Sequence, residues 1–248
     1  MIQMTDTVKQ LLIINVIFFI GSYIVGQPAL DILALYFPEN PKFHFWQPIT
    51  HMFMHGGIMH IFFNMLALYS FGSMLENMWG GKKFLFFYIS CGLGAAALHI
   101  VVNYISFYQG LDVLADNGFT KSQVMAVFNN QSSGGLSANA DITALTKIAK
   151  AYFTPALGAS GAIYGTMVAF AFMFPNAELM MMFIPIPVKA KYFVPGLLVF
   201  DLVMGLRGEA VLGQGDGIAH FAHIGGAIVG FIMMWYWKKN SFNNKRWN

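Results

Sequence analysis

The chain alternates long apolar runs with shorter polar connections. A helix of about 20 apolar residues crosses the hydrocarbon core of a bilayer. On this basis the pattern predicts an all-α polytopic membrane protein with six spans, folded as a single domain over residues 1–248. The spans are expected at residues 11–26, 58–75, 84–105, 152–174, 193–206 and 218–237.

Three connections are not expected to cross. The proline-bounded segment PALDILALYFPENPKFHFW is amphipathic and is predicted to lie in the membrane interface. The run LMMMFIPIP is too short to span and ends in prolines, so it is interpreted as a connection or partial entry.

The third connection, residues 106–151, is longer than an ordinary loop and is interpreted as an extracytoplasmic insertion. It is predicted to form two short amphipathic helices on the outer membrane surface. Thr120 and Asp141 are the expected helix caps, and the polar stretch QSSGGLSAN is the flexible join.

Composition supports the membrane assignment. The chain is 57% hydrophobic and 10% charged, whereas soluble domains carry roughly 25% charged residues. The net charge of +3 is scattered, with no arginine-rich face, which argues against nucleic-acid binding. The single cysteine, Cys91, lies in an apolar run, so neither a disulfide framework nor a cysteine metal site is expected. We expect no cofactor and no metal ion.

Basic residues predict the orientation. Nine of the 14 Lys and Arg residues fall on one side of a six-span arrangement, and the positive-inside rule makes that side cytoplasmic. They are Lys9, Lys82, Lys83, Lys189, Lys191, Lys238, Lys239, Lys245 and Arg246. We therefore expect an integral multi-pass protein of the plasma membrane with both termini cytoplasmic. The second, fourth and sixth spans then enter from the extracytoplasmic face.

Polar side chains inside these three spans are the candidates for chemistry, because such groups are costly in lipid. Ser160 lies between small residues in GASGAIYG, near the start of the fourth span. His60 and Asn64, four residues apart, share one face of the second span, and His223 lies in the sixth. All four are expected at a common depth of about 10 Å below the outer surface. They would form a hydrolytic site inside the membrane.

Other interpretations of these residues exist. Gly161 and Gly165 could form a helix-packing face in which Ser160 merely bonds a neighbouring carbonyl. His51 and His55, four residues apart, could bind a metal ion or haem, although no acidic or cysteine ligand accompanies them.

A transporter would use acids inside the membrane as a relay. The candidates are Asp201 in the fifth span and Glu76 at the inner end of the second. Both are interpreted as structural, accepting hydrogen bonds from helix ends or loops. His220, three residues before His223, is interpreted as a satisfied polar group under the outer surface.

Four motifs in order along the chain, WQPITHMFMHGGIMHIFFNM, GSMLE, GASGAIYG and AHFAHIGGAIVG, resemble those of the rhomboid family of intramembrane serine proteases. The resemblance implies that Ser160 is the nucleophile and His223 the base. It places His60 and Asn64 in an oxyanion hole with the Ser160 backbone N–H, and Tyr164 against His223.

The same resemblance gives other positions structural roles. His51 and His55 match histidines that shape the pocket and the first outer loop, and Trp46, Glu76, Gly226 and Gly230 match structural positions. The insertion at 106–151 departs from the family, because many relatives have a shorter loop there.

The resulting hypothesis is a serine endopeptidase that cleaves transmembrane protein substrates, among membrane lipids, near their extracytoplasmic end. The catalytic pair is expected to be a dyad. No acid follows His223 in its span, so the imidazole is expected to be oriented by packing against Tyr164. The alternative is a rhomboid-like pseudoenzyme that acts as a scaffold for membrane segments.

Overall fold

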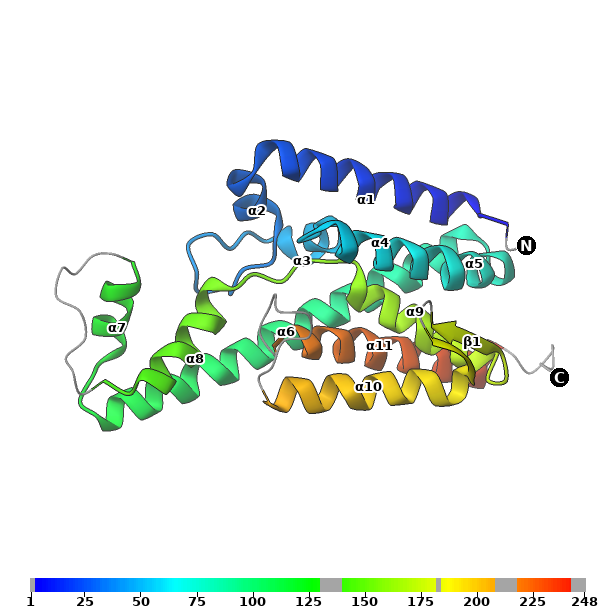
Figure 1. Ribbon diagram of the computed structural model, residues 1–248. Coiled ribbons are helices and arrows are strands. Elements are labelled where there is room, and N and C mark those ends of the chain that lie inside the picture. The colour runs from blue at the N-terminus through cyan, green and yellow to red at the C-terminus, as the bar shows by residue number, and fades with distance from the viewer. Residues whose placement is uncertain (1–2, 130–139, 182–183, 208–217, 242–248) are drawn as a thin grey trace.

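The computed structural model describes residues 3–129, 140–181, 184–207 and 218–241, and it confirms the predicted all-α architecture (Figure 1). The helices before the central one are α1 (Asp6–Val25), α2 (Gln27–Leu33), α3 (Gln47–Thr50), the 3-10 turn η1 (His51–Phe53), α4 (Ile58–Ala67), the π-helical η2 (Leu68–Gly72) and α5 (Ser73–Trp79). The others are α6 (Gly81–Asp116), α7 (Lys121–Phe128), α8 (Ile142–Phe153), α9 (Ser160–Met173), α10 (Ala190–Arg207) and α11 (Ile218–Ser241).

In the part of the chain that the structure describes, four helical stretches are long and apolar enough to cross a membrane. They are Asp6–Val25, Ile58–Trp79, Gly81–Asp116 and Ala219–Lys239. Helix α9 is apolar but shorter, so the count of six spans stays a prediction. The start of α1 and the end of α11 lie at the same end of the bundle (Figure 1).

Two helices have ends that differ from those predicted for the spans. The third span was expected to end at residue 105, but α6 continues to Asp116 because Phe107 and Leu114 are buried under α7 and α8. The fourth was expected to begin at residue 152, but α9 begins at Ser160. Pro155 lies between α8 and α9, and proline disfavours helical geometry in the residue before it.

Both expected caps in the insertion are present. The Thr120 side chain accepts a hydrogen bond from the Gln123 N–H, and Asp141 accepts one from the Ala144 N–H at 2.9 Å. The apolar faces of α7 and α8 are covered by protein, since Val124 and Ile148 are fully buried in a cluster with the extended part of α6. These faces therefore pack against α6, and the location of the insertion on the outer membrane surface stays a prediction. The expected join, QSSGGLSAN, lies outside the described residues.

The other two connections that were expected not to cross form short elements. The run LMMMFIPIP contributes to an antiparallel hairpin of β1 (Glu178–Met181) and β2 (Ile184–Lys189), which pairs Glu178 with Lys189. In the proline-bounded segment, α2 has only seven residues. Neither element is long enough to span a bilayer.

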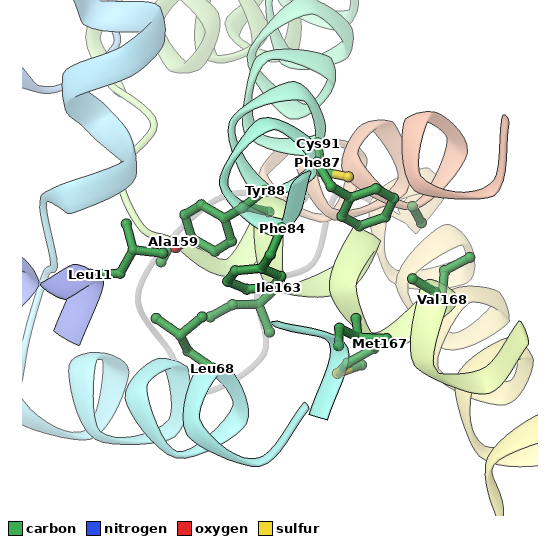
Figure 2. Close-up of a cluster of buried hydrophobic side chains, with 14 of the residues drawn as sticks. Leu11, Leu68, Phe84, Phe87, Tyr88, Cys91, Ala159, Ile163, Met167 and Val168 are labelled. Atoms are coloured by element: carbon green, nitrogen blue, oxygen red, sulfur yellow. The ribbon is translucent and has the colours of Figure 1, made fainter. Parts of the chain in front are cut away.

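The main core lies between α1, η2, α6 and α9 (Figure 2). Side chains from these elements, including Leu11, Leu68, Phe84 and Ile163, meet there. Ala159 belongs to the same cluster and is fully buried directly before Ser160. Packing of the core therefore fixes where α9 begins.

A glycine seam joins α9 to α11. A Cβ atom on Gly226 would overlap the carbonyl oxygen of Gly161, and one on Gly230 would lie 2.8 Å from the Cα atom of Gly165. Backbones that approach this closely leave no room for a side chain. The close helix approach expected from these glycines is confirmed, and it sets the separation between the N-terminal ends of the two helices.

Candidate active site

The loop that leads into Ser160 is held by backbone hydrogen bonds. Leu35 and Ala156 exchange two such bonds, at 2.9 and 2.8 Å, and the Gly158 N–H donates to the His51 carbonyl at 2.9 Å. Gly158 has a φ of 124°, and a Cβ atom there would lie 2.8 Å from Nε2 of His60. Glycine is thus required by both the backbone and the neighbouring ring.

Ser160 and His223 lie within hydrogen-bonding distance of each other. Ser160 is the first residue of α9, and its Oγ lies 2.9 Å from Nε2 of His223 on α11. Tyr164, one turn after Ser160, stacks on the His223 ring with centroids 4.2 Å apart and planes inclined by 12°. The N–H groups of the first turn of α9 have no partner within the helix and point toward its N-terminal end, where Ser160 lies.

His60 and Asn64 lie on α4, beside the start of α9. The Gly56 N–H approaches Nδ1 of His60 at 3.4 Å, which favours the tautomer that carries its proton on Nε2, the atom nearest Gly158. Asn64 is 6% exposed, and its Nδ2 atom has no hydrogen-bond partner among the described residues. His60 therefore offers a donor close to Gly158 and Ser160, and Asn64 offers a buried donor one turn further along α4.

His51 and His55 support this arrangement from outside the spanning helices. Nδ1 of His51 lies 2.9 Å from the Gln47 carbonyl, and burial lowers the pKa of His51 to about 4. His55 packs edge-on against His60, with ring centroids 5.1 Å apart. Burial, together with the adjacent His60, lowers the pKa of His55 to about 4. Both rings are therefore neutral near pH 7.

The two acids occupy different environments. Glu76 accepts hydrogen bonds from the Thr5 hydroxyl and from the N–H groups of Thr7 and Val8, so it caps α1 as expected of a structural acid. The hydrogen-bond partners of Asp201 differ from the helix ends or loops that were expected. Its Oδ1 atom faces no helix end but two imidazoles of α11, His220 Nδ1 at 2.5 Å and His223 Nδ1 at 3.4 Å.

Sequence reasoning missed this arrangement because it looked for an acid only after His223 in the same span. The signal available was an acid in the fifth span and two histidines three residues apart at the start of the sixth. His220 is satisfied, as expected, but its partner is the carboxylate that also faces His223.

Asp201, His220 and His223 are also the described residues best placed to hold a metal ion, with ligand atoms within 4.8 Å of one another. Hydrogen bonds to one carboxylate oxygen already account for the positions of both Nδ1 atoms. His51 and His55, the pair considered from sequence, do not belong to this group.

The rhomboid domain family matches residues 42–240, a range that contains every site residue named above. The chain belongs to the rhomboid family. Its site therefore lies in a fold whose members are generally intramembrane serine proteases acting on membrane-protein substrates.

Individual relatives support this membership. An uncharacterized mitochondrial rhomboid protein of Schizosaccharomyces pombe is 28% identical over 79% of this chain and 52% of its own length. The mitochondrial rhomboid protein 1 of Saccharomyces cerevisiae is 25% identical over 77% of this chain and 41% of its own. The rhomboid protease GluP of Bacillus subtilis is 42% identical over 19% of this chain and 10% of its own. The chain thus spans about half or less of these relatives.

The expected plasma-membrane location is wrong by this comparison. The two relatives that match most of the chain are named mitochondrial. The distribution of basic residues could not reveal the mitochondrial relationship, because it predicts which side of a membrane each loop lies on but not which membrane the protein occupies. The multi-pass nature of the protein is unaffected.

Proposed function

We propose that this rhomboid-family protein is an intramembrane serine endopeptidase that cleaves transmembrane segments of other membrane proteins. Ser160 is the nucleophile and His223 the general base. The observation that carries the proposal is the 2.9 Å separation between Ser160 Oγ and His223 Nε2, on two helices fixed by the glycine seam. A serine needs such a base because its hydroxyl is weakly nucleophilic at its ordinary pKa.

The reaction uses one proton carrier. Ser160 Oγ attacks the peptide carbonyl while its proton passes to Nε2 of His223, and this proton then goes to the leaving amine. Nε2 of His223 then takes a proton from water as the water oxygen attacks the acyl carbonyl, and it returns this proton to Ser160 Oγ as the ester bond breaks and the new carboxyl terminus leaves. Tyr164, stacked on the ring, limits its rotation between the two steps.

The oxyanion formed by the attack needs donors. The Ser160 backbone N–H, at the start of α9, supplies one, and Nε2–H of His60 supplies another. Asn64 is the third donor, because its buried Nδ2 atom has no hydrogen-bond partner within the described part of the chain. An unmet buried donor costs about 1–3 kcal/mol, a cost that a substrate oxygen would remove.

The position of the serine suggests how substrate is cut. Helix α11 ends at the same end of the bundle at which α1 starts, so the first turns of α9 and α11, which carry Ser160 and His223, are on the side away from the termini (Figure 1). A helical substrate hides its carbonyls in hydrogen bonds and must unwind locally before attack. We propose that cleavage occurs near this end of the substrate span, beside small residues that fit the narrow approach over Gly158 and Gly161.

The test is cleavage of a single-span model protein by purified protein in liposomes, with Ser160→Ala as the matched control. The proposal predicts products from the wild type, none from the variant, and a cut mapped by mass spectrometry to the end of the span away from the protease termini. Tight substrate binding by both proteins without cleavage would instead indicate a scaffold.

A further inference from the structure

Asp201 is a carboxylate buried between helices. It lies on α10, is 2% exposed, and has its Oδ1 atom 2.5 Å from Nδ1 of His220 and 3.4 Å from Nδ1 of His223. The two histidines are three residues apart and therefore share one face of α11. The Tyr164 hydroxyl also interacts with this carboxylate.

A buried charge is retained only where hydrogen bonds or opposite charges compensate it. Here the compensation comes from the ring that acts on Ser160, from the tyrosine stacked on that ring, and from His220. If Asp201 served only to join α10 to α11, His220 would suffice as its partner. The contacts with His223 and Tyr164 place the carboxylate behind the catalytic pair.

We propose that Asp201 is a positioning residue for His223 and that His220 holds Asp201 in place, so that the dyad is completed by an acid from a third helix. This inference rests on the proposed function of Ser160 and His223. A carboxylate beside Nδ1 keeps the imidazole proton on that nitrogen and leaves Nε2 free to accept the Ser160 proton.

The carboxylate also acts after the proton has moved. When Nε2 takes the Ser160 proton, the ring becomes an imidazolium, and the negative charge of Asp201 stabilises it. No proton passes to Asp201 at any step. The contact of 3.4 Å is longer than an ordinary hydrogen bond, so the effect is smaller than the loss of about 10⁴-fold found when the acid of a closely bonded Ser-His-Asp triad becomes an amide.

Amide and alanine variants separate this role from a structural one. Asp201→Asn keeps the shape of the side chain and its capacity for neutral hydrogen bonds but removes the charge. We expect it to lower kcat by about 10- to 100-fold with little change in KM and in unfolding temperature. Asp201→Ala should lower kcat at least as much. Val199→Ala, at a position on the same helix that is 61% exposed, is the control and should behave as wild type.

His220 provides a second matched pair. The side-chain amide nitrogen of asparagine can occupy roughly the place of Nδ1 of a histidine. His220→Asn should therefore retain more activity than His220→Ala, which leaves Asp201 without its nearest donor. Equal activity in the two variants would contradict the role of His220 as the holder of Asp201.

The decisive experiment joins kinetics to histidine ¹⁵N spectra of selectively labelled protein, with His223→Gln used to assign the signal. We expect His223 to carry its proton on Nδ1 in the wild type and to lose this preference in Asp201→Ala, whether or not a substrate is cut. An unchanged tautomer together with wild-type kcat in Asp201→Asn would overturn the inference. A wild type that has the expected tautomer but cuts no substrate would contradict the proposed function instead. Loss of activity on adding a chelator would show that the three residues hold a metal ion, and would also overturn the inference.

Discussion

Gly230 of α11 lies directly against the backbone of Gly165 of α9, so that a Cβ atom on the first would be 2.8 Å from the Cα atom of the second. One turn nearer the site, Gly226 meets Gly161 in the same way. Ser160 and His223 lie just beyond these contacts. The distance between Ser160 and His223 is therefore set by backbone packing between the two helices.

This packing makes the seam sensitive to a single methyl group. Gly226→Ala would place Cβ on the Gly161 carbonyl, and because the obstacle is backbone, the helices must separate. We expect substrate cleavage to fall by at least about 10-fold, since displacements near 1 Å cost roughly 100-fold where geometry is critical. Gly21→Ala in α1, where nothing lies within 4 Å of the added atom, is the control. Wild-type cleavage by Gly226→Ala would show that the seam does not set the site.

The oxyanion donors should affect turnover more than affinity. Asn64→Asp preserves the shape of the side chain but replaces its unpaired Nδ2 donor with an acceptor. We expect kcat to fall by about 100- to 1,000-fold with KM nearly unchanged, because the lost contact forms mainly in the transition state. Steady-state kinetics on a single-span substrate measure both constants. A rise in KM at constant kcat would assign Asn64 to substrate binding.

The buried histidines predict how stability depends on pH. The pKa of His51 and that of His55 are about 4 in the folded protein, below the usual value of about 6.5 in an unfolded chain. Above pH about 6.5 both states are neutral, so these groups leave stability unchanged. As pH falls from there toward about 4, the unfolded state binds protons first, and at pH about 5 folding should lose about 2 kcal/mol per histidine.

Unfolding in detergent at several pH values measures this slope. His51→Asn offers an amide donor for the Gln47 carbonyl in place of the ring but does not titrate, so it should flatten the dependence by about half. The same slope in this variant and in wild type would mean that other groups are responsible.

The sequence was sufficient for those parts of the protein that depend on local pattern. The apolar runs predicted the all-α membrane fold, and Thr120, Asp141 and Glu76 were placed correctly as hydrogen-bonding groups at helix ends or loops. The start of α9 could not be read from hydropathy, because Tyr152 and Ser160 both lie in an apolar context. Burial of Ala159 in the core and the turn at Gly158 decide it.

The environment of Asp201 depends on tertiary packing. Its position in the fifth span gave no information about which face of α10 turns toward α11, or at what depth. Asp201 can reach His220 and His223 only because α10 packs beside α11 and the three residues lie at the same height along the two helices. The glycine seam differs, because both of its glycine pairs could be recognised from their spacing of four residues.

The central claim is that Ser160 is a nucleophile activated by His223, and a fluorophosphonate tests it most directly because it reacts with activated serines without requiring a substrate. Purified wild-type protein should be labelled, with the adduct mapped to Ser160 by mass spectrometry, and labelling should be lost in Ser160→Ala and strongly reduced in His223→Ala. Equal labelling of wild type and Ser160→Ala, or no labelling of a correctly folded wild type, would contradict the account.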